Sequence, residues 1–302
     1  MVTNNKGTRM KTKIDKVVQS LTDAIEELRT INTGPEDTEA EEAEEEGEEK
    51  GDFVREERTD IKEERPNRLG APLRPGQGPW FAPKRATELH RERGNYVGGK
   101  PKFIVLHFTA GQFRTNANMI ATMRYGQNQG LTFAGVARDG TRHLWHNIDK
   151  FGWHAGASNW RGVSSLNNKS FGIEMANPGR LERKNGRWQT WYGEDVTGHP
   201  SLITVASKEN VVRGTYIKAS PEQVISTLEL TMACMCYWGL AAADVTSHDE
   251  ISPGRKSDMG AIFGGKTISE IRKFIDDNYP FFIQNGGYIG PKGREILTAW
   301  VS

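Results

Sequence analysis

Two stretches of the chain gather side chains that could do chemistry. The first ends an apolar run at His107, and the second is the polar segment that opens on His248 and closes on Asp258. Together these residues offer two imidazole nitrogens and one carboxylate oxygen, which is the number of protein ligands in a catalytic zinc site whose fourth position holds water. A single histidine at a strand end is more often structural, and the three residues do not form a compact motif. A zinc site and a structural role therefore both stay open at this point.

Strand and helix patterns indicate how these residues are positioned. The run Phe103–Phe108 is apolar except for His107 and precedes Thr-Ala-Gly, which is typical of a buried strand that leads into a loop. His107 lies at the carboxyl end of that strand, where sites in α/β sheets tend to form. The other expected elements are a strand over 171–175, a hairpin turning at Asp139–Gly140, a helix from Ser220 to about Ala243 and a last helix over about 268–278. This irregular alternation predicts an α/β fold with a mixed central β-sheet flanked by helices.

Four sequence blocks carry a resemblance to a known family. They are Ile104–Gly111, Gly152–Ser158, Asn167–Asn177 and His248–Asp258, and they stand in the family's order. In these blocks the chain resembles the zinc-dependent N-acetylmuramoyl-L-alanine amidases of type 2. That family includes AmpD-like amidases, phage lysozyme-type amidases and peptidoglycan recognition proteins. The resemblance covers about residues 100–280 and implies the zinc amidase fold over that range.

The resemblance also implies roles for individual residues. It implies that His107, His248 and Asp258 bind Zn²⁺. It further implies that Glu174 is the catalytic carboxylate and that Lys256 is the catalytic lysine. The chain reads Thr-Phe-Ala at 132–134, where one branch of the family keeps a catalytic tyrosine, so we assign it to the branch that uses a carboxylate.

Amide hydrolysis at neutral pH requires an activated water, a polarised carbonyl and a proton for the leaving amine. Zinc lowers the pKa of its bound water to about 7 and acts as a Lewis acid on the carbonyl. Glu174 is placed to take the proton of the water and deliver it to nitrogen. The Lys256 ammonium is placed to stabilise the developing oxyanion. The plainer alternatives are a solvent-facing strand carboxylate for Glu174 and a surface loop charge for Lys256, with the neighbouring Arg255 bracing the loop.

Aromatic residues cluster near these blocks. Five of the eight tryptophans lie between residues 145 and 191, and aromatic faces suit sugar rings, although most buried tryptophans fill cores. We expect substrate contacts from His154, Trp153, Trp160 and Asn177. The stretch 179–219, with Trp188 and Trp191, is longer than the minimal family core and is a candidate wall of the substrate groove. Cys234 and Cys236 are expected to be core residues and cannot form a disulfide framework.

The net charge of +1 hides two electrostatically opposite parts. Residues 36–65 hold 16 acidic and 5 basic side chains, whereas residues 66–302 carry a net charge of +10. The predicted organisation has four parts: an amphipathic helix at 1–34, an acidic and then Pro/Gly-rich linker at 35–99, a catalytic domain at 100–282 and a C-terminal tail at 283–302. Apolar residues from Met10 to Ile31 alternate steps of four and three. That spacing fits a short coiled coil for self-association or docking on a virion, or one helix packed on its own domain.

The leading hypothesis is a zinc-dependent peptidoglycan hydrolase that cleaves the amide bond between N-acetylmuramic acid and L-alanine. The alternative is a non-catalytic peptidoglycan-binding or structural virion component with a degenerate site. No apolar run is long enough for a membrane span, no secretory signal is evident and no nucleic-acid-binding motif accompanies the basic charge. We therefore expect a protein made in the cytoplasm that acts on the cell wall as a phage lysin or virion component. A cytosolic recycling enzyme is the less favoured setting.

Overall fold

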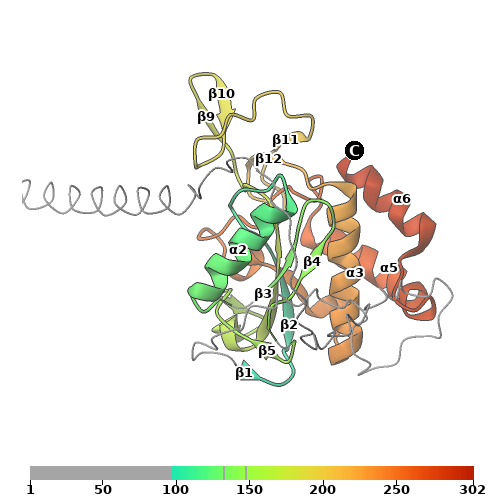
Figure 1. Ribbon diagram of the computed structural model, residues 1–302. Helices are drawn as coiled ribbons and strands as arrows, with labels where there is room; N and C mark the ends of the chain where they lie inside the picture. The colour runs from blue at the N-terminus through green and yellow to red at the C-terminus, as the bar shows by residue number, and fades with distance from the viewer. Residues whose placement is uncertain (1–96, 132, 147) are drawn as a thin grey trace, which may run out of the picture. The chain divides into compact units, whose positions relative to one another are not determined.

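The computed structural model describes residues 97–131, 133–146 and 148–302 (Figure 1). The N-terminal helix expected at 1–34 and the linker up to residue 96 lie outside the described residues. Strand β1 (Val97–Gly98) pairs antiparallel with β5 (Lys150–Phe151). Residues 97–99, which the sequence assigned to the linker, therefore belong to the folded part.

A mixed sheet of five strands forms the centre of the fold, in the order β13-β2-β8-β3-β4. Its members are β2 (Phe103–Phe108), β3 (Phe133–Val136), β4 (Arg142–His143), β8 (Ser170–Met175) and β13 (Val245–Ser247). All neighbours run parallel except β4, which runs antiparallel to β3. The expected hairpin is confirmed, because the Ala137 N–H donates to the Thr141 carbonyl at 2.9 Å across the turn. The α/β class with a mixed sheet flanked by helices is also confirmed.

Alternation along the strands gives the sheet two distinct faces. Ile104 and Leu106 of β2 and Ile173 of β8 pack into the main core together with residues of the helix over Pro221–Trp238. His107 and Glu174 alternate with these residues and so point to the opposite face. The register of β2 against β8 pairs His107 directly with Glu174. The sheet thereby aligns two candidate site residues near the carboxyl ends of adjacent strands.

Helices cover both faces of the sheet. Helix α2 (Asn116–Asn128) lies on one side, and α3 (Pro221–Trp238) lies on the other, between the sheet and the helices α5 (Ile268–Gln284) and α6 (Gly290–Val301) (Figure 1). Cys234 and Cys236 are buried on α3, as expected. Among the described residues no helix is both long and apolar enough to cross a lipid bilayer.

The ends of the helices differ from the predicted ones. Helix α3 stops at Trp238 rather than near Ala243, because Gly239 adopts the left-handed conformation (φ 62°) that ends many helices. Helix α5 runs six residues beyond Asn278, to Gln284. The stretch 283–302, predicted to be a tail, contains α6, which buries Leu297 and Val301 against the main core.

Short elements complete the structure. The long stretch 179–219 forms two hairpins, β9 (Glu182–Lys184) with β10 (Arg187–Gln189) and β11 (Leu202–Val205) with β12 (Gly214–Ile217). Strands β6 (Asn159–Trp160) and β7 (Val163–Ser164) also pair. The remaining elements are η1 (Leu166–Asn168), η2 (Ala242–Asp244) and the one-turn helix α4 (His248–Ile251).

A buried carboxylate ties α6 to the body of the fold. Glu229 of α3 accepts hydrogen bonds from Arg142 of β4 and Arg294 of α6, both at 2.9 Å. Glu229→Ala would leave two guanidinium groups, one of them largely buried, without their carboxylate. Breaking such a pair costs about 3 kcal/mol of unfolding free energy, and urea denaturation is the measurement. Glu295→Ala, at an exposed position of α6, is the control, and a Glu229→Ala protein as stable as this control would contradict the prediction.

Candidate functional site

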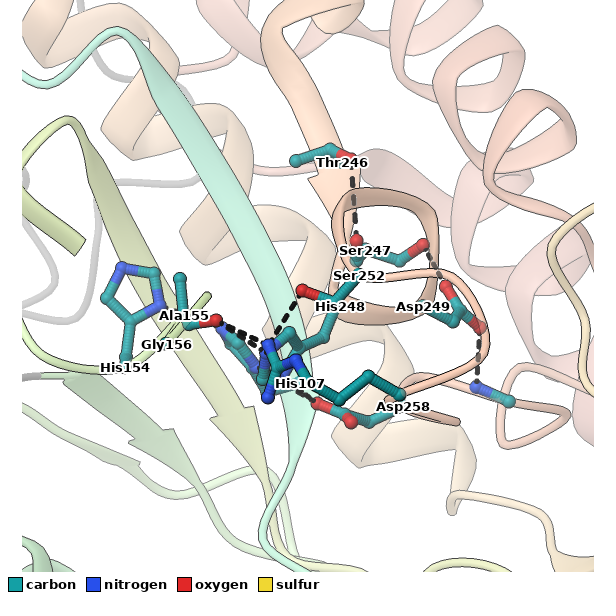
Figure 2. Close-up of polar contacts among 12 residues, drawn as sticks. His107, His154, Ala155, Gly156, Thr246, Ser247, His248, Asp249, Ser252 and Asp258 are labelled. Carbon is teal, nitrogen blue, oxygen red and sulfur yellow. Dashed lines mark hydrogen bonds and ion pairs between the residues drawn. The ribbon is translucent and has the colours of Figure 1, made fainter. Parts of the chain in front are cut away.

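Three side chains meet at the carboxyl end of the parallel strands (Figure 2). His107 comes from the end of β2, His248 is the first residue of α4, and Asp258 follows in the next loop. The two Nδ1 atoms lie 2.9 Å apart, and Asp258 Oδ2 lies 3.0 Å from Nδ1 of His107 and 2.7 Å from Nδ1 of His248. All three residues are buried. The structure thus brings together the three residues expected to bind metal.

The donor set and its spacing fit a divalent cation. Ligand atoms about 2.0–2.1 Å from a tetrahedral zinc ion lie about 3.3 Å from one another, close to the separations in this cluster. The second nitrogen of each imidazole already has a partner, since His248 Nε2 donates to the Ala155 carbonyl at 3.0 Å and His107 Nε2 lies 2.9 Å from His154 Nδ1. Both Nδ1 atoms are therefore left to bind a cation, together with the carboxylate.

The protonation states also suit a metal site. Burial, reinforced by the neighbouring His248, lowers the pKa of His107 to about 4. Burial alone would raise the pKa of Asp258, but the hydrogen bonds with His107 and His248 outweigh it and hold this pKa below its usual range. At neutral pH His107 is accordingly neutral and Asp258 is ionised, which are the forms that bind cations.

His154 lies directly behind His107. Its Nε2 donates to the Ser170 carbonyl at 3.0 Å, which leaves Nδ1 as the acceptor for the Nε2–H of His107. The ring also packs against Gly172 of β8, where an added Cβ would sit 2.8 Å from the imidazole. A glycine on this strand therefore makes room for an imidazole that fixes the orientation of a candidate ligand.

Glu174 and Lys256 flank the cluster. Glu174 Oε2 is buried and has no hydrogen-bond partner among the described residues. Burial, reinforced by the Asp258 carboxylate, raises the pKa of Glu174 to about 8 against the opposing influence of the Lys256 ammonium. The Lys256 charge also acts on His107. A carboxyl group with an unpaired oxygen and an elevated pKa, beside a candidate cation-binding cluster, is suited to proton transfer.

Arg255 braces the loop that carries the ligands, as the sequence suggested. One nitrogen of its guanidinium donates to the carbonyls of Ala155 and Ala157, at 2.9 Å and 2.8 Å, and to the Ser252 hydroxyl at 2.7 Å. The Ala155 carbonyl also accepts the hydrogen bond of His248. This carbonyl could not be predicted from the sequence, because a backbone group has no signature in the residue type.

The side chains expected to contact substrate occupy different environments. Trp153 is 45% exposed and stands next to His154, with its backbone in the left-handed region (φ 41°). Trp160 packs edge-on against Phe103, and Arg161 and Arg272 lie over its ring. Asn177 is fully buried, where it donates to the Ile217 carbonyl at 2.8 Å and accepts from the Gly179 N–H at 3.0 Å. Of these residues, the structure leaves Trp153 the most open to a ligand.

The chain is similar to proteins of one family. The family model described as N-acetylmuramoyl-L-alanine amidase matches residues 97–261. A curated relative, AmiD from Escherichia coli (strain K12), is 23% identical over 171 residues. The match covers 56% of this chain and 52% of the relative, so the chain spans about half the length of the curated relative that it matches.

Two solved structures illustrate the likeness. The complex of AmiD from E. coli with anhydro-N-acetylmuramic acid-L-Ala-D-gamma-Glu-L-Lys is 20% identical, covers 57% of this chain and 58% of its own, and has a TM-score of 0.40. AMPDH3 from Pseudomonas aeruginosa in complex with anhydromuramic pentapeptide is 18% identical, covers 71% of this chain and 79% of its own, and has a TM-score of 0.40. Because the family model spans more than half of the 302 residues, the protein belongs to the N-acetylmuramoyl-L-alanine amidase family.

Proposed function

We propose that the protein is a zinc-dependent peptidoglycan hydrolase that cleaves the amide bond between N-acetylmuramic acid and L-alanine. The observation that carries this proposal is the convergence of His107, His248 and Asp258 at one point beside Glu174, whose Oε2 is buried and has no hydrogen-bond partner among the described residues. Family membership supports the choice of peptidoglycan as the partner. The three convergent atoms are the ligands that would hold Zn²⁺, with Nδ1 of each histidine and Oδ2 of the aspartate turned toward the ion.

The chain's own residues divide the remaining work of hydrolysis. A bound zinc ion supplies Lewis acidity to the scissile carbonyl and lowers the pKa of the attacking water. Glu174 takes the proton from that water as its oxygen bonds to the carbonyl carbon, and returns it to the nitrogen as the carbon–nitrogen bond breaks. The products are the lactyl carboxylate of the muramic acid and the free amine of L-alanine. Lys256 stabilises the negative charge that develops on the carbonyl oxygen.

Substrate contacts are assigned by exposure. Trp153 is the best placed of the four residues expected from the sequence, because its ring is open and its neighbour His154 bonds to His107. The backbone conformation of Trp153 is costly for a bulky residue and is the kind of strain that collects at functional sites. We assign the substrate contact first to this side chain.

The biological setting belongs to the same proposal. The +10 charge of residues 66–302 suits approach to anionic cell-wall polymers. An acidic tract and a heptad-like segment at residues 10–31 favour a phage lysin or virion-associated lysin over a recycling enzyme. Size measurement of residues 1–70, with and without candidate virion proteins, tests the docking or self-association of that segment.

Muropeptide digestion tests the activity itself. The full chain, loaded with zinc and incubated with purified peptidoglycan, is expected to release stem peptides with a free N-terminal alanine, detected by mass spectrometry. Chelation should stop the release, and added zinc should restore it. A protein that binds one equivalent of zinc and releases no stem peptide would refute the hydrolase and favour the non-catalytic binding protein.

A substitution at His154 tests the imidazole pair behind the metal site. His154→Phe removes the acceptor for the His107 Nε2–H and is expected to weaken zinc binding by about 10–100-fold, the usual cost of losing a partner of a metal ligand. Competition with a chromogenic chelator measures the affinity. His154→Gln, which keeps an acceptor, should restore part of it, and His199→Phe at a half-buried position serves as the control. Unchanged zinc affinity in His154→Phe would contradict the assignment.

A further inference from the structure

An exposed tryptophan lies in the long stretch 179–219, and the proposed mechanism gives this residue no role. Trp191 is 61% exposed, and among the described residues only it and Trp153 are tryptophans with large exposed surfaces. It stands in the tight turn between β10 and β11, where the Thr190 N–H donates to the Glu194 carbonyl at 2.9 Å. Single exposed apolar residues are common on protein surfaces, so the case for a contact surface depends on how Trp191 is held and on where it lies.

Polar contacts fix this turn to the loop that follows β2. The Trp191 indole N–H donates to the Ala110 carbonyl, and the Tyr192 hydroxyl donates to the Gly111 carbonyl at 3.3 Å. The two rings meet edge to face with centroids 5.5 Å apart. Glu194, next in the turn, pairs with Arg114 at 2.5 Å. The indole is therefore held through its N–H, while the residue stays 61% exposed to solvent.

The anchoring loop follows β2, the strand that carries His107, and leads to α2. Ala110 is only three residues beyond His107, a length of chain that spans at most about 10 Å. The same loop bonds to the end of β8, through the Thr109 N–H to the Met175 carbonyl at 3.0 Å and the Gly111 N–H to the Asn177 carbonyl at 3.3 Å. Ala110 itself is in the left-handed region (φ 49°), a strained conformation for a residue other than glycine. Trp191 is thus anchored close to the carboxyl ends of β2 and β8, where His107 and Glu174 lie side by side.

The chemistry around the ring selects the kind of ligand. With its N–H already bonded, the indole offers apolar faces with negative electrostatic character, which match the C–H groups on the face of a sugar ring. The nearby charges of Arg114 and Glu194 compensate each other, so they do not favour the carboxylates of a stem peptide. We propose that Trp191 is a stacking subsite for a saccharide ring of the glycan strand at the cleaved bond. This inference rests on the proposed function, since peptidoglycan supplies the saccharide.

Binding measurements on the full zinc-loaded chain, made inactive by Glu174→Gln, test the subsite apart from turnover. Trp191→Ala is expected to raise the Kd for a peptide-free glycan fragment of alternating N-acetylglucosamine and N-acetylmuramic acid about tenfold, the loss of one aromatic contact. The Kd for a free stem peptide should not change. Trp191→Phe keeps an aromatic face but loses the bond to Ala110, so its Kd for the glycan fragment should lie between those of the parent chain and Trp191→Ala. Tyr125→Ala, at a 64% exposed aromatic residue of α2, is the control and should alter neither Kd.

The outcomes separate this inference from the proposed function. Equal glycan affinity in Trp191→Ala and its parent, or a loss confined to the stem peptide, would overturn the saccharide subsite even if the wild-type chain cleaves muropeptides normally. A glycan affinity that depends on Trp191, together with a zinc-loaded wild-type chain that releases no stem peptide, would uphold the subsite and refute the hydrolase. In an active chain, Trp191→Ala should raise KM for muropeptides with extended glycans and leave kcat nearly unchanged. A fall in kcat alone would count against a binding role.

Discussion

Glu174→Gln lowers the turnover of muropeptides by about 10²–10⁴-fold, the usual contribution of a positioned acid–base group, while one equivalent of zinc stays bound. Glutamine keeps the size of the side chain but cannot carry a proton between the water and the leaving nitrogen. Oε2 of Glu174 is buried and lacks a hydrogen-bond partner among the described residues, and Glu174 pairs with His107 across two adjacent strands. Turnover by quantitative release of stem peptide, together with metal analysis, is the measurement.

The matched control is Glu182→Gln on β9, an exposed strand carboxylate paired with Lys184. It should leave turnover unchanged. If Glu174→Gln turned over substrate as fast as the control, Glu174 would lose its assigned role, while the metal site would stand.

The same carboxyl group gives the reaction its pH dependence. The pKa of Glu174 is raised to about 8, chiefly by burial, and the positive charge of a bound cation would lower it again. Glu174 must be ionised to accept a proton, so kcat/KM is expected to rise with pH through this pKa, and its acidic limb to lie below about pH 8. A wild-type rate that falls steadily as the pH rises over this range would contradict the assignment.

Asp258→Ala abolishes turnover by removing the metal. Removing a residue that only hydrogen-bonds to a metal ligand usually weakens metal binding by about 10–100-fold. The loss of a residue that would bind the metal directly is therefore expected to weaken it further. The substitution also removes the only anionic oxygen of the cluster and leaves the two imidazoles facing each other at 2.9 Å. Metal analysis after dialysis, chelator competition and stem-peptide release should all report the loss.

Thermal unfolding adds an independent test of that site. A ligand that binds only the folded state raises its stability, so zinc should raise the Tm of the wild-type chain and leave that of Asp258→Ala unchanged. Asp276→Ala, at an exposed position of α5, is the control and should respond to zinc as the wild type does. Stoichiometric zinc in dialysed Asp258→Ala would show that the ligands lie elsewhere.

The candidate metal-binding cluster could be predicted from the sequence because side chains carry its signal. His107, His248 and Asp258 have distinctive residue types in ordered blocks, and the strand that ends at His107 is readable from its apolar run. The partners of these residues were not readable in the same way. The carbonyls of Ala155 and Ser170 orient His248 and His154, yet any residue has a carbonyl.

The roles of the tryptophans depend on tertiary packing. The sequence did not distinguish Trp160 from Trp153 as a substrate contact. In the structure, Arg272 of α5 lies over the Trp160 ring, 5.1 Å from its centroid. The two residues are more than a hundred positions apart, so the sequence could not indicate this contact. The exposure of Trp191 could not be predicted from its residue type, because it depends on a turn that bonds to Ala110 and Gly111, about eighty positions away in the chain. Helix α6 could not be predicted either. It follows the Gly286–Gly287 pair, and two glycines are as typical of the end of a folded domain as of a turn between helices.

The Arg255 brace has a thermodynamic consequence. It joins the loop of the metal ligands to the loop of residues 155–157, and the Ala155 carbonyl serves both Arg255 and His248. Trp153 and His154 lead directly into that second loop. Where one network orders both loops, substrate and cation affinities become linked, and each ligand must strengthen the other by the same factor. Substitutions at 155–157 should then shift cation affinity although His107, His248 and Asp258 are unchanged, so the proposed substrate contact at Trp153 and the proposed metal centre are expected to respond together.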